Sequence, residues 1–189
     1  IDPSKPFMPF GSSPKVGASF ILGSSIFNNA ITKLSFTGTW NNFPHEGIAE
    51  YYKNLDSTIT HNSFKVEKYC LENGNWMPYD EDSKNIFSGD KNSAYSFDFI
   101  SDKTFGVTPA NEEIKKSYIN SKGGFVKLVI SNNNGFGFGH SKYPKKYTEQ
   151  AIKEAGNVVT EGAAAFDNSL PNEAYTPLLS DFKMSYEAY

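Results

Sequence analysis

The stretch TKLSFTGTW, residues 32–40, decides the fold class of this chain. The apolar residues in it are Leu34, Phe36 and Trp40, and they alternate with Lys33, Ser35, Thr37 and Thr39. A period of two places the two sets on opposite faces of an extended strand. One apolar face and one polar face are typical of an antiparallel sheet that is solvated on one side. Residues 32–40 therefore predict a half-buried antiparallel strand.

Similar patterns recur along the chain at the short spacing of an all-β sandwich. They predict strands over residues 18–22, 64–71, 75–79, 95–99 and 180–189. Asn73-Gly74 stands between two of these strands, and Asn-Gly between apolar runs is a strong hairpin signal. Residues 125–131 are nearly continuously apolar, with Lys127 as the interruption, so they predict a central strand that is covered on both faces.

The composition supports the same fold class. The 189 residues include 16 Phe, 11 Tyr and 2 Trp, residue types that fit the surface of a sheet, and 15 Gly and 10 Pro for turns. This length is typical of one domain. We predict an all-β chain: a single antiparallel β-sandwich domain, jelly-roll-like, over residues 18–189, with an extended N-terminal arm over residues 1–17.

We expect only one or two short helices. Residues 46–55 carry apolar side chains on one side, and residues 144–155 predict a helix that ends at Gly156 as its C-cap. Thr108-Pro109, followed by two glutamates, resembles a helix start. Residues 157–168 show no clear period and predict a loop.

Charge and cysteine content argue against several classes of protein. All 18 basic residues are lysine and the net charge is −3, whereas a nucleic-acid binder normally presents a basic stripe with arginine. No apolar stretch approaches the ~20 residues of a membrane helix, and residues 1–6 lack the pattern of a signal peptide. Cys70 is the single cysteine, which excludes an intrachain disulfide, and we expect it to be a buried small hydrophobe.

No motif predicts a catalytic, cofactor or metal site. His45, His61 and His140 lack the spacing of a zinc site, and we expect each of them to be structural or solvent-facing. The acidic residues 80–82 resemble the start of a calcium loop but lack its later ligands. A polar connector is the preferred interpretation, and the calcium alternative stays open.

The abundance of aromatic residues suggests surface rings that bind a partner. Trp76, Tyr79 and Tyr52 are the candidate interface or ligand residues. Exposed Tyr and Trp serve protein interfaces or stack on sugars. The alternative is that the three rings belong to the core or its rim, because large aromatic side chains are mostly buried.

Short strings along nearly the whole chain resemble one family. They include PFG at 9–11 and PKVGASF at 14–20, and continue at 34–40, 43–44, 62–66, 73–76, 124–128, 138–140, 143–144, 170–173 and 175–177. In this order they resemble a segment of the large, baseplate J-like proteins of extracellular contractile injection systems, which are phage-tail-like particles. The chain begins with Ile1 rather than Met, and the resemblance implies a segment of a much longer subunit.

The resemblance implies a non-catalytic structural module whose partners are other baseplate subunits. It also implies no cofactor, and assembly in the cytoplasm into a particle that is later released or stays with the cell. Arginine is common in the energetic centres of interfaces, so an arginine-free module is expected to bind through aromatic packing, strand edges and lysine rims, with weak salt dependence. The alternative function is a carbohydrate-binding β-sandwich.

Overall fold

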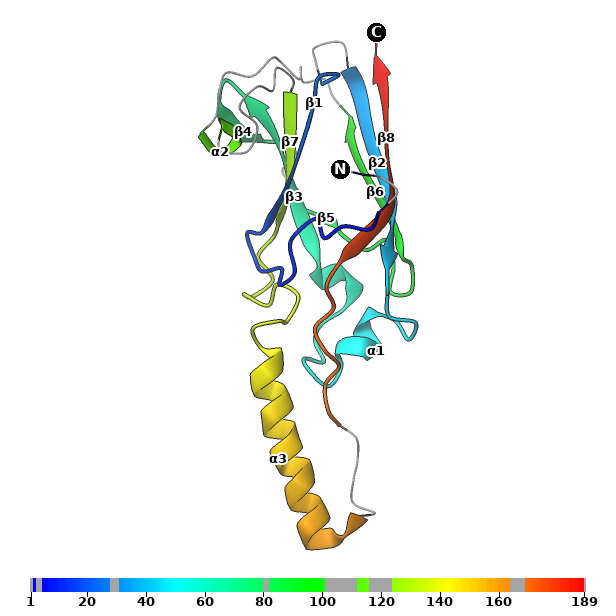
Figure 1. Ribbon diagram of the computed structural model, residues 1–189, viewed down its shortest axis with the longest axis vertical. Coiled ribbons are helices and arrows are strands. Elements are labelled where there is room, and N and C mark those ends of the chain that lie inside the picture. Colours follow the sequence, from blue (N-terminus) through cyan, green and yellow to red (C-terminus); the bar gives the residue numbers. More distant parts are fainter. Residues whose placement is uncertain are drawn as a thin grey trace.

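The computed structural model describes residues 2, 5–27, 31–79, 82–100, 112–115, 124–163 and 169–188. Among them, two antiparallel sheets face each other (Figure 1). The first sheet has the order β1 (Ser19–Ser24), β7 (Gly124–Ile130), β3 (Lys65–Glu72) and β4 (Asn75–Pro78), with β5 (Lys84–Asn85) also paired to β3. The second has the order β6 (Ala94–Ile100), β2 (Ile31–Asn41) and β8 (Leu178–Ala188). The predicted antiparallel β-sandwich is confirmed.

The apolar face of β2 forms part of the core between the sheets. Leu34, Phe36 and Trp40 are 0%, 1% and 2% exposed, as their alternation predicts. Aromatic rings fill much of this space: Phe36 stacks on Phe182 of β8 with 5.8 Å between ring centroids. Burying such large side chains is the main stabilising contribution, at about 1.5–3 kcal/mol for each.

β7 is covered on both faces. Val126, Leu128 and Ile130 belong to the core between the sheets. Phe125 points to the other side, where it packs with Ile114 of the short helix α2 (Glu112–Lys115). The predicted central strand is therefore confirmed, and α2 covers its outer face at Phe125.

The helices differ in extent from the prediction. α1 (Ile48–Tyr52) is shorter than residues 46–55, and a 3-10 turn, η1 (His61–Ser63), follows it. α3 (Tyr143–Glu161) does not end at Gly156 but continues to Glu161 and is capped by Gly162, whose φ is 87°. The predicted end and the predicted loop at 157–161 are wrong. The helix start expected at Thr108-Pro109 lies outside the described residues.

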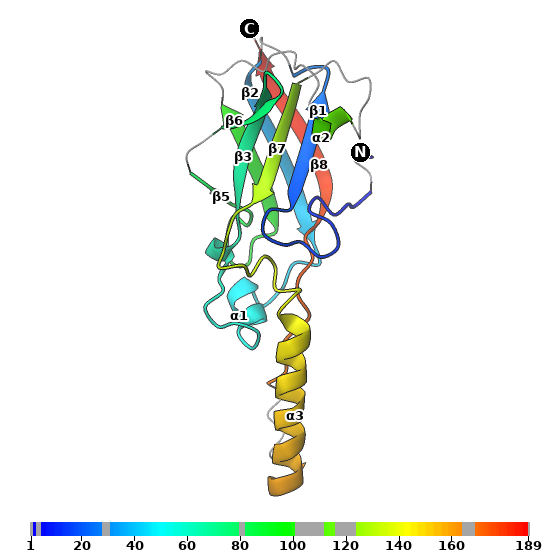
Figure 2. The ribbon, with the colours of Figure 1, turned by 90° about the vertical axis from the view of Figure 1, so that its left-hand side faces the viewer.

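A tertiary contact explains why α3 passes Gly156. A glycine inside a helix costs only about 1 kcal/mol relative to alanine, so it does not by itself end the helix. Glu154 is buried and accepts hydrogen bonds from the backbone N–H and the hydroxyl of Ser169, at 2.8 and 2.7 Å. Ser169, in the segment that follows α3, thus holds this part of the helix in place. α3 extends away from the sandwich, and we call this projecting helix, Tyr143–Glu161, the spur (Figure 2).

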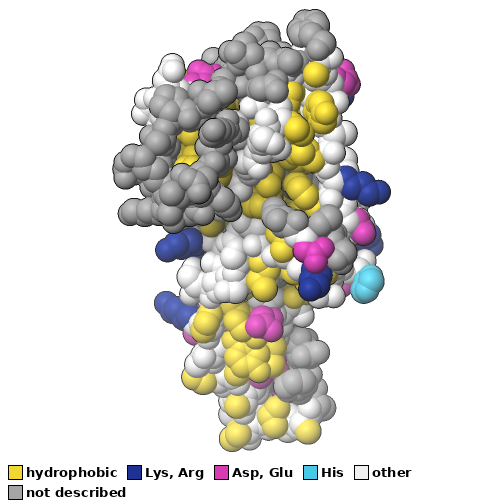
Figure 3. Space-filling model, turned by 45° about the horizontal axis from the view of Figure 1, so that its top comes forward, with side chains coloured by type: hydrophobic (Ala, Val, Ile, Leu, Met, Phe, Trp, Pro, Cys, Tyr) yellow, Lys and Arg dark blue, Asp and Glu magenta, His cyan; other side chains and the backbone are white. Residues whose placement is uncertain are grey.

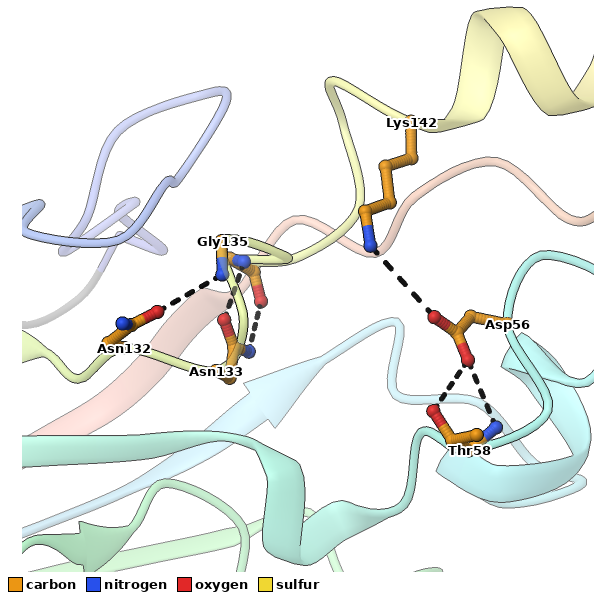
Figure 4. A network of polar contacts seen from close by, with 7 residues as sticks. Asp56, Thr58, Asn132, Asn133, Gly135 and Lys142 are labelled. Atoms are coloured by element: carbon orange, nitrogen blue, oxygen red, sulfur yellow. Dashed lines mark hydrogen bonds and ion pairs between the residues drawn. The ribbon is translucent and has the colours of Figure 1, made fainter.

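The loop before α3, residues 131–142, contains Gly135, Gly137 and Gly139 and packs against the core of the sandwich. Phe136 and Phe138 are 3% and 0% exposed, so these rings fold back on the core. The side chain of Asn133 accepts a hydrogen bond from the N–H of Gly137 at 2.7 Å and donates one to its carbonyl at 2.9 Å (Figure 4). Gly137 has a φ of 57°, a conformation that favours glycine.

Asp56 joins α3 to the loop that follows α1. Its carboxylate accepts hydrogen bonds from the hydroxyl and the N–H of Thr58 at 2.6 and 3.0 Å, and it lies 4.0 Å from the ammonium of Lys142 (Figure 4). The hydrogen bond from the Thr58 side chain is the largest cause of the lowered pKa of Asp56. The junction between the sandwich and the spur is thus fixed by specific polar contacts.

The N-terminal arm joins the two sheets. Phe7 exchanges two backbone hydrogen bonds with Leu179 of β8, at 3.0 and 2.8 Å. Its ring lies 5.6 Å from that of Phe20 on β1 and 5.7 Å from that of Phe182 on β8. The ring of Phe7 therefore packs between β1 and β8, near the Leu179 end of β8. The predicted boundary at residue 17 stays a prediction.

Candidate functional site

Tyr52, one of the three aromatic candidates, is a core residue. It is 1% exposed, and its hydroxyl donates to the carbonyl of Phe138 at 2.9 Å and accepts from the N–H of Tyr175 at 3.1 Å. Burial raises the pKa of Tyr52 far above the usual tyrosine value, which keeps the hydroxyl protonated as a donor. Tyr52 thus links α1 to the segments around Phe138 and Tyr175. A ring buried in this way cannot stack on an external ligand.

Tyr79, the second candidate, is also buried, at 9% exposed. The ammonium of Lys68 lies 4.9 Å from the centroid of its ring, and Lys68 is itself 5% exposed. A lysine ammonium over an aromatic ring is attracted by the negative face of the ring, which offsets part of the cost of burying the charge. Tyr79 thus serves the packing of the lysine beside it.

Trp76, the third candidate, is half-buried on the outer face of the first sheet. Its indole N–H donates to the carboxylate of Glu113 at 2.7 Å. The ammonium of Lys127 lies 4.3 Å from the Trp76 ring, 5.6 Å from the Tyr69 ring and 3.6 Å from the Glu113 carboxylate. We call these four residues, Tyr69, Trp76, Glu113 and Lys127, the Trp76 cluster.

Strand register explains how the Trp76 cluster forms. Trp76 lies opposite Leu71, and Tyr69 lies opposite Lys127, so β4, β3 and β7 present these side chains on one face. The alternation within each strand predicts which of its side chains share a face, but it does not predict which strands are neighbours. Trp76 was therefore predictable as a candidate, whereas its three partners, which lie on β3, β7 and α2, were not. The structure does not bring Trp76, Tyr79 and Tyr52 onto one exposed surface.

The histidines are placed as structural or surface residues. The Nε2 of His140 lies 2.8 Å from the hydroxyl of Thr176, which donates to the carbonyl of Ser12 at 3.2 Å. Burial lowers the pKa of His140, and the charge of Glu173 acts in the opposite direction. This chain of contacts orients the ring between three backbone segments. His45 is exposed and His61 lies in η1.

Among the described residues, the surface includes open hollows of about 490 and 480 Å³. The first is lined by Trp40, Phe43, His45 and Lys91 among others, and the second by serine, threonine and asparagine side chains near Asn132. Within the described ranges, no group of three or more His, Cys, Asp or Glu side chains is placed to hold a metal ion. Asp80, the start of the possible calcium loop, lies outside those ranges.

Two further groups, one buried and one partly buried, have structural roles. Cys70 is buried in β3, as expected of a small hydrophobe. Asp90 accepts a hydrogen bond from the N–H of Ala49 at 2.9 Å, in the first turn of α1. A carboxylate at a helix N-terminus is favoured by the exposed N–H groups there.

The fold and these contacts define a class: a β-sandwich module whose aromatic and polar side chains described above serve packing within the chain. The model of the family of baseplate proteins described as PVC11-like matches residues 3–161, and the chain belongs to this family. It is thus a structural component of the baseplate of a contractile injection system. The comparison with curated proteins finds no match. In the part of the chain described, no helix is long and apolar enough to cross a membrane.

Proposed function

We propose that this chain is a non-catalytic module that mediates assembly of the baseplate by binding neighbouring subunits. Membership of the baseplate family over residues 3–161 supports a role in the baseplate. The proposal further places the module within a large, baseplate J-like subunit that assembles in the cytoplasm. It treats residues 18–189 as one domain that carries the arm of residues 1–17.

The observation that carries the proposed contact is the Trp76 cluster. Trp76 is the one of the three candidate rings that solvent reaches substantially, and it lies beside the half-exposed carboxylate of Glu113. A half-exposed aromatic ring with charged groups around it is typical of an interface, where the ring is covered and the rim stays polar. We therefore assign the outer face of the first sheet, around Trp76, to contact with a neighbouring subunit.

The carbohydrate-binding alternative gains no support from a specific observation. The candidate rings for sugar stacking are Trp76, Tyr79 and Tyr52, and Tyr52 and Tyr79 are both in the core. The remaining ring, Trp76, already has the Lys127 ammonium 4.3 Å from its centroid. We do not propose this function.

The experiment compares assembly with Trp76→Ala and with Met77→Ala in the full-length subunit. Met77 is 45% exposed, and as the next residue of β4 its side chain points to the opposite face, so it is a matched control. We expect Trp76→Ala to reduce the recovery of neighbouring subunits in pull-downs by about tenfold, because a central aromatic contact contributes ~1.4 kcal/mol or more.

The salt dependence and stability of the same complexes complete this test. Because the contact is expected to be aromatic and arginine-free, raising the salt concentration should reduce recovery only weakly. Thermal unfolding of each variant separates a lost contact from a lost fold. Normal recovery of neighbouring subunits with folded Trp76→Ala protein would contradict the proposed contact.

A further inference from the structure

β8 lies at the edge of the second sheet, with β2 as its neighbour on one side. On its other side, the pairing given by the described residues is the short bridge between Phe7 and Leu179. Beyond that bridge, residues 183–187 pair regularly with residues 33–37 of β2, and register shifts bound this segment at each end. The segment 183–187 is therefore a regularly paired piece of edge strand whose outer N–H and C=O groups can accept another strand.

Two apolar side chains of this segment reach the surface. Tyr186 lies opposite Leu34 and Met184 opposite Phe36, so both point toward the side of the sheet that carries the core. Yet Met184 and Tyr186 are 39% and 53% exposed, whereas Leu34 and Phe36 are fully buried. Figure 3 shows apolar side chains reaching the surface in a band along the upper half of the molecule. Met184 and Tyr186 thus form an apolar strip on the core-side face of β8 that solvent reaches.

The other face of the segment carries a symmetrical charge pattern. Lys183, Ser185 and Glu187 are all exposed and lie on the solvent side, opposite Thr37, Ser35 and Lys33 of β2. The positive and negative charges are equally distant from Ser185. An antiparallel copy of the same segment, centred on Ser185, would therefore place each lysine opposite a glutamate.

We propose that β8 pairs with β8 of a second copy of this chain, antiparallel and about a two-fold axis at Ser185. In this register Lys183 lies opposite Glu187 of the second copy, and Met184 lies opposite Tyr186 of the second copy, each pair occurring twice. Both apolar pairs fall on the core side and both ion pairs on the solvent side. The two three-stranded sheets then form one continuous sheet. This surface is distinct from the Trp76 cluster, so the inference goes beyond the proposed function.

A second copy fits this edge for reasons of register and charge. Shifting the axis from Ser185 to Met184 would set Lys183 against Ser185 and so lose both Lys183–Glu187 pairs. Glu187 already lies 3.9 Å from Lys33, so in the proposed register it would lie between two lysines. A strand that is self-complementary in charge and shape makes the isologous contact that two-fold symmetry requires.

The first test cross-links the proposed axis in the full-length chain. Ser185→Cys brings two identical residues together at the axis, where directly opposed Cβ atoms lie about 5 Å apart. Ser19→Cys is the matched control, because Ser19 is also exposed and lies on β1, an edge strand of the other sheet. Cys70 is buried and should not react. Under oxidation or with a short bis-maleimide, we expect Ser185→Cys to form dimers at least about tenfold faster than Ser19→Cys. Equal rates would overturn the proposal.

The second test uses charge reversal and its rescue. We expect Lys183→Glu and Glu187→Lys each to weaken dimerisation by about tenfold, because each creates two like-charge pairs, and the double variant to restore it. Sedimentation equilibrium measures this, with thermal unfolding as the check on folding. Failure of the double variant to recover, a wild-type chain that stays monomeric up to millimolar concentration, or a β8 edge that binds a strand of another subunit instead would each overturn the proposal. Trp76→Ala should leave this dimer unchanged, which separates this inference from the proposed function.

Discussion

At the scale of single residues, Tyr52 joins three segments that are distant in the sequence. Its buried hydroxyl satisfies the Phe138 carbonyl and the Tyr175 N–H together. Tyr52→Phe removes both hydrogen bonds and leaves two buried backbone groups without this partner. We expect the free energy of unfolding to fall by about 1–3 kcal/mol, measured by urea denaturation.

Tyr147→Phe is the control for that measurement. Tyr147 lies on α3 and is 40% exposed, so water can hydrate its hydroxyl in the folded chain as in the unfolded chain. Removing this hydroxyl therefore leaves no buried group without a partner. We expect a change of less than about 0.5 kcal/mol. If Tyr52→Phe changed the free energy of unfolding as little as Tyr147→Phe, the hydroxyl of Tyr52 would not stabilise the fold.

Because of His140, we expect the free energy of unfolding to fall at acidic pH. Burial lowers the pKa of His140 below the usual histidine value, and its buried Nδ1 has no hydrogen-bond partner among the described residues. The unfolded chain therefore binds a proton more readily than the folded chain. The stability contributed by the neutral ring is complete above the unfolded pKa and is lost as the pH falls through the lower folded pKa.

The pH dependence of unfolding tests this role of His140. We expect the free energy of unfolding to decrease between pH 7.5 and 5, and His140→Gln to flatten this decrease, because glutamine does not titrate. The glutamine amide can still hydrogen-bond to Thr176, so the variant preserves part of the local contact. A decrease of the same size in both proteins would exclude His140 as its source.

At the scale of elements, α3 contains an unfavourable glycine that the structure tolerates. Gly156 lies in the helix interior, and a Cβ at this position would meet nothing within 4 Å. We expect Gly156→Ala to raise the free energy of unfolding by about 0.5–1 kcal/mol, through a better helix propensity and a less flexible unfolded chain. Chemical denaturation, with circular dichroism for helix content, measures the effect.

Gly162→Ala is the opposing control for α3. Gly162 has φ 87° and ψ 173°, a backbone region that is almost exclusive to glycine and costs another residue about 1–3 kcal/mol. We expect this substitution to destabilise the protein or to fray the last turn. If both substitutions had the same sign, the assignment of Gly162 rather than Gly156 to the helix end would be contradicted.

The elements also show where sequence patterns succeed. The alternation in residues 32–40 and the apolar run in 125–131 predicted β2 and β7, because burial on one or both faces of a strand follows directly from its side-chain period. The end of α3 was not predictable from Gly156 alone, because a glycine inside a helix and one at its end differ only in their surroundings.

At the scale of the whole molecule, the N-terminal arm joins the two sheets at Phe7. Phe7→Ala removes a ring that contacts Phe20 and Phe182. We expect the free energy of unfolding to fall by about 2 kcal/mol, because the buried part of the ring and its aromatic contacts are lost. Met8→Ala is the control, since Met8 is 49% exposed. A similar loss for both residues would contradict this role of Phe7 in joining the sheets.

Family membership and sandwich architecture were both accessible from the sequence. The ordered strings pointed to a contractile injection baseplate protein, and the family match over residues 3–161 confirms that class. The finer identity with a baseplate J-like protein stays part of the proposed function. These features were accessible because they depend on local order and short-range alternation, which the chain carries in itself.

The candidate site was only partly accessible. Composition predicted that some rings would be available for contacts, but Tyr52 and Tyr79 lie in the core while Trp76 is half-buried beside Glu113 and Lys127. Whether a ring is covered depends on which other segment packs over it, and that segment is often far away in the sequence.

The sequence by itself thus determined the type of fold, the faces of the strands and the class of particle. Only the tertiary structure decided which aromatic rings are buried, where α3 ends and that β8 lies at the edge of its sheet. The physical reason is that a strand's pattern fixes its faces, whereas its neighbours are chosen by the packing of the whole chain.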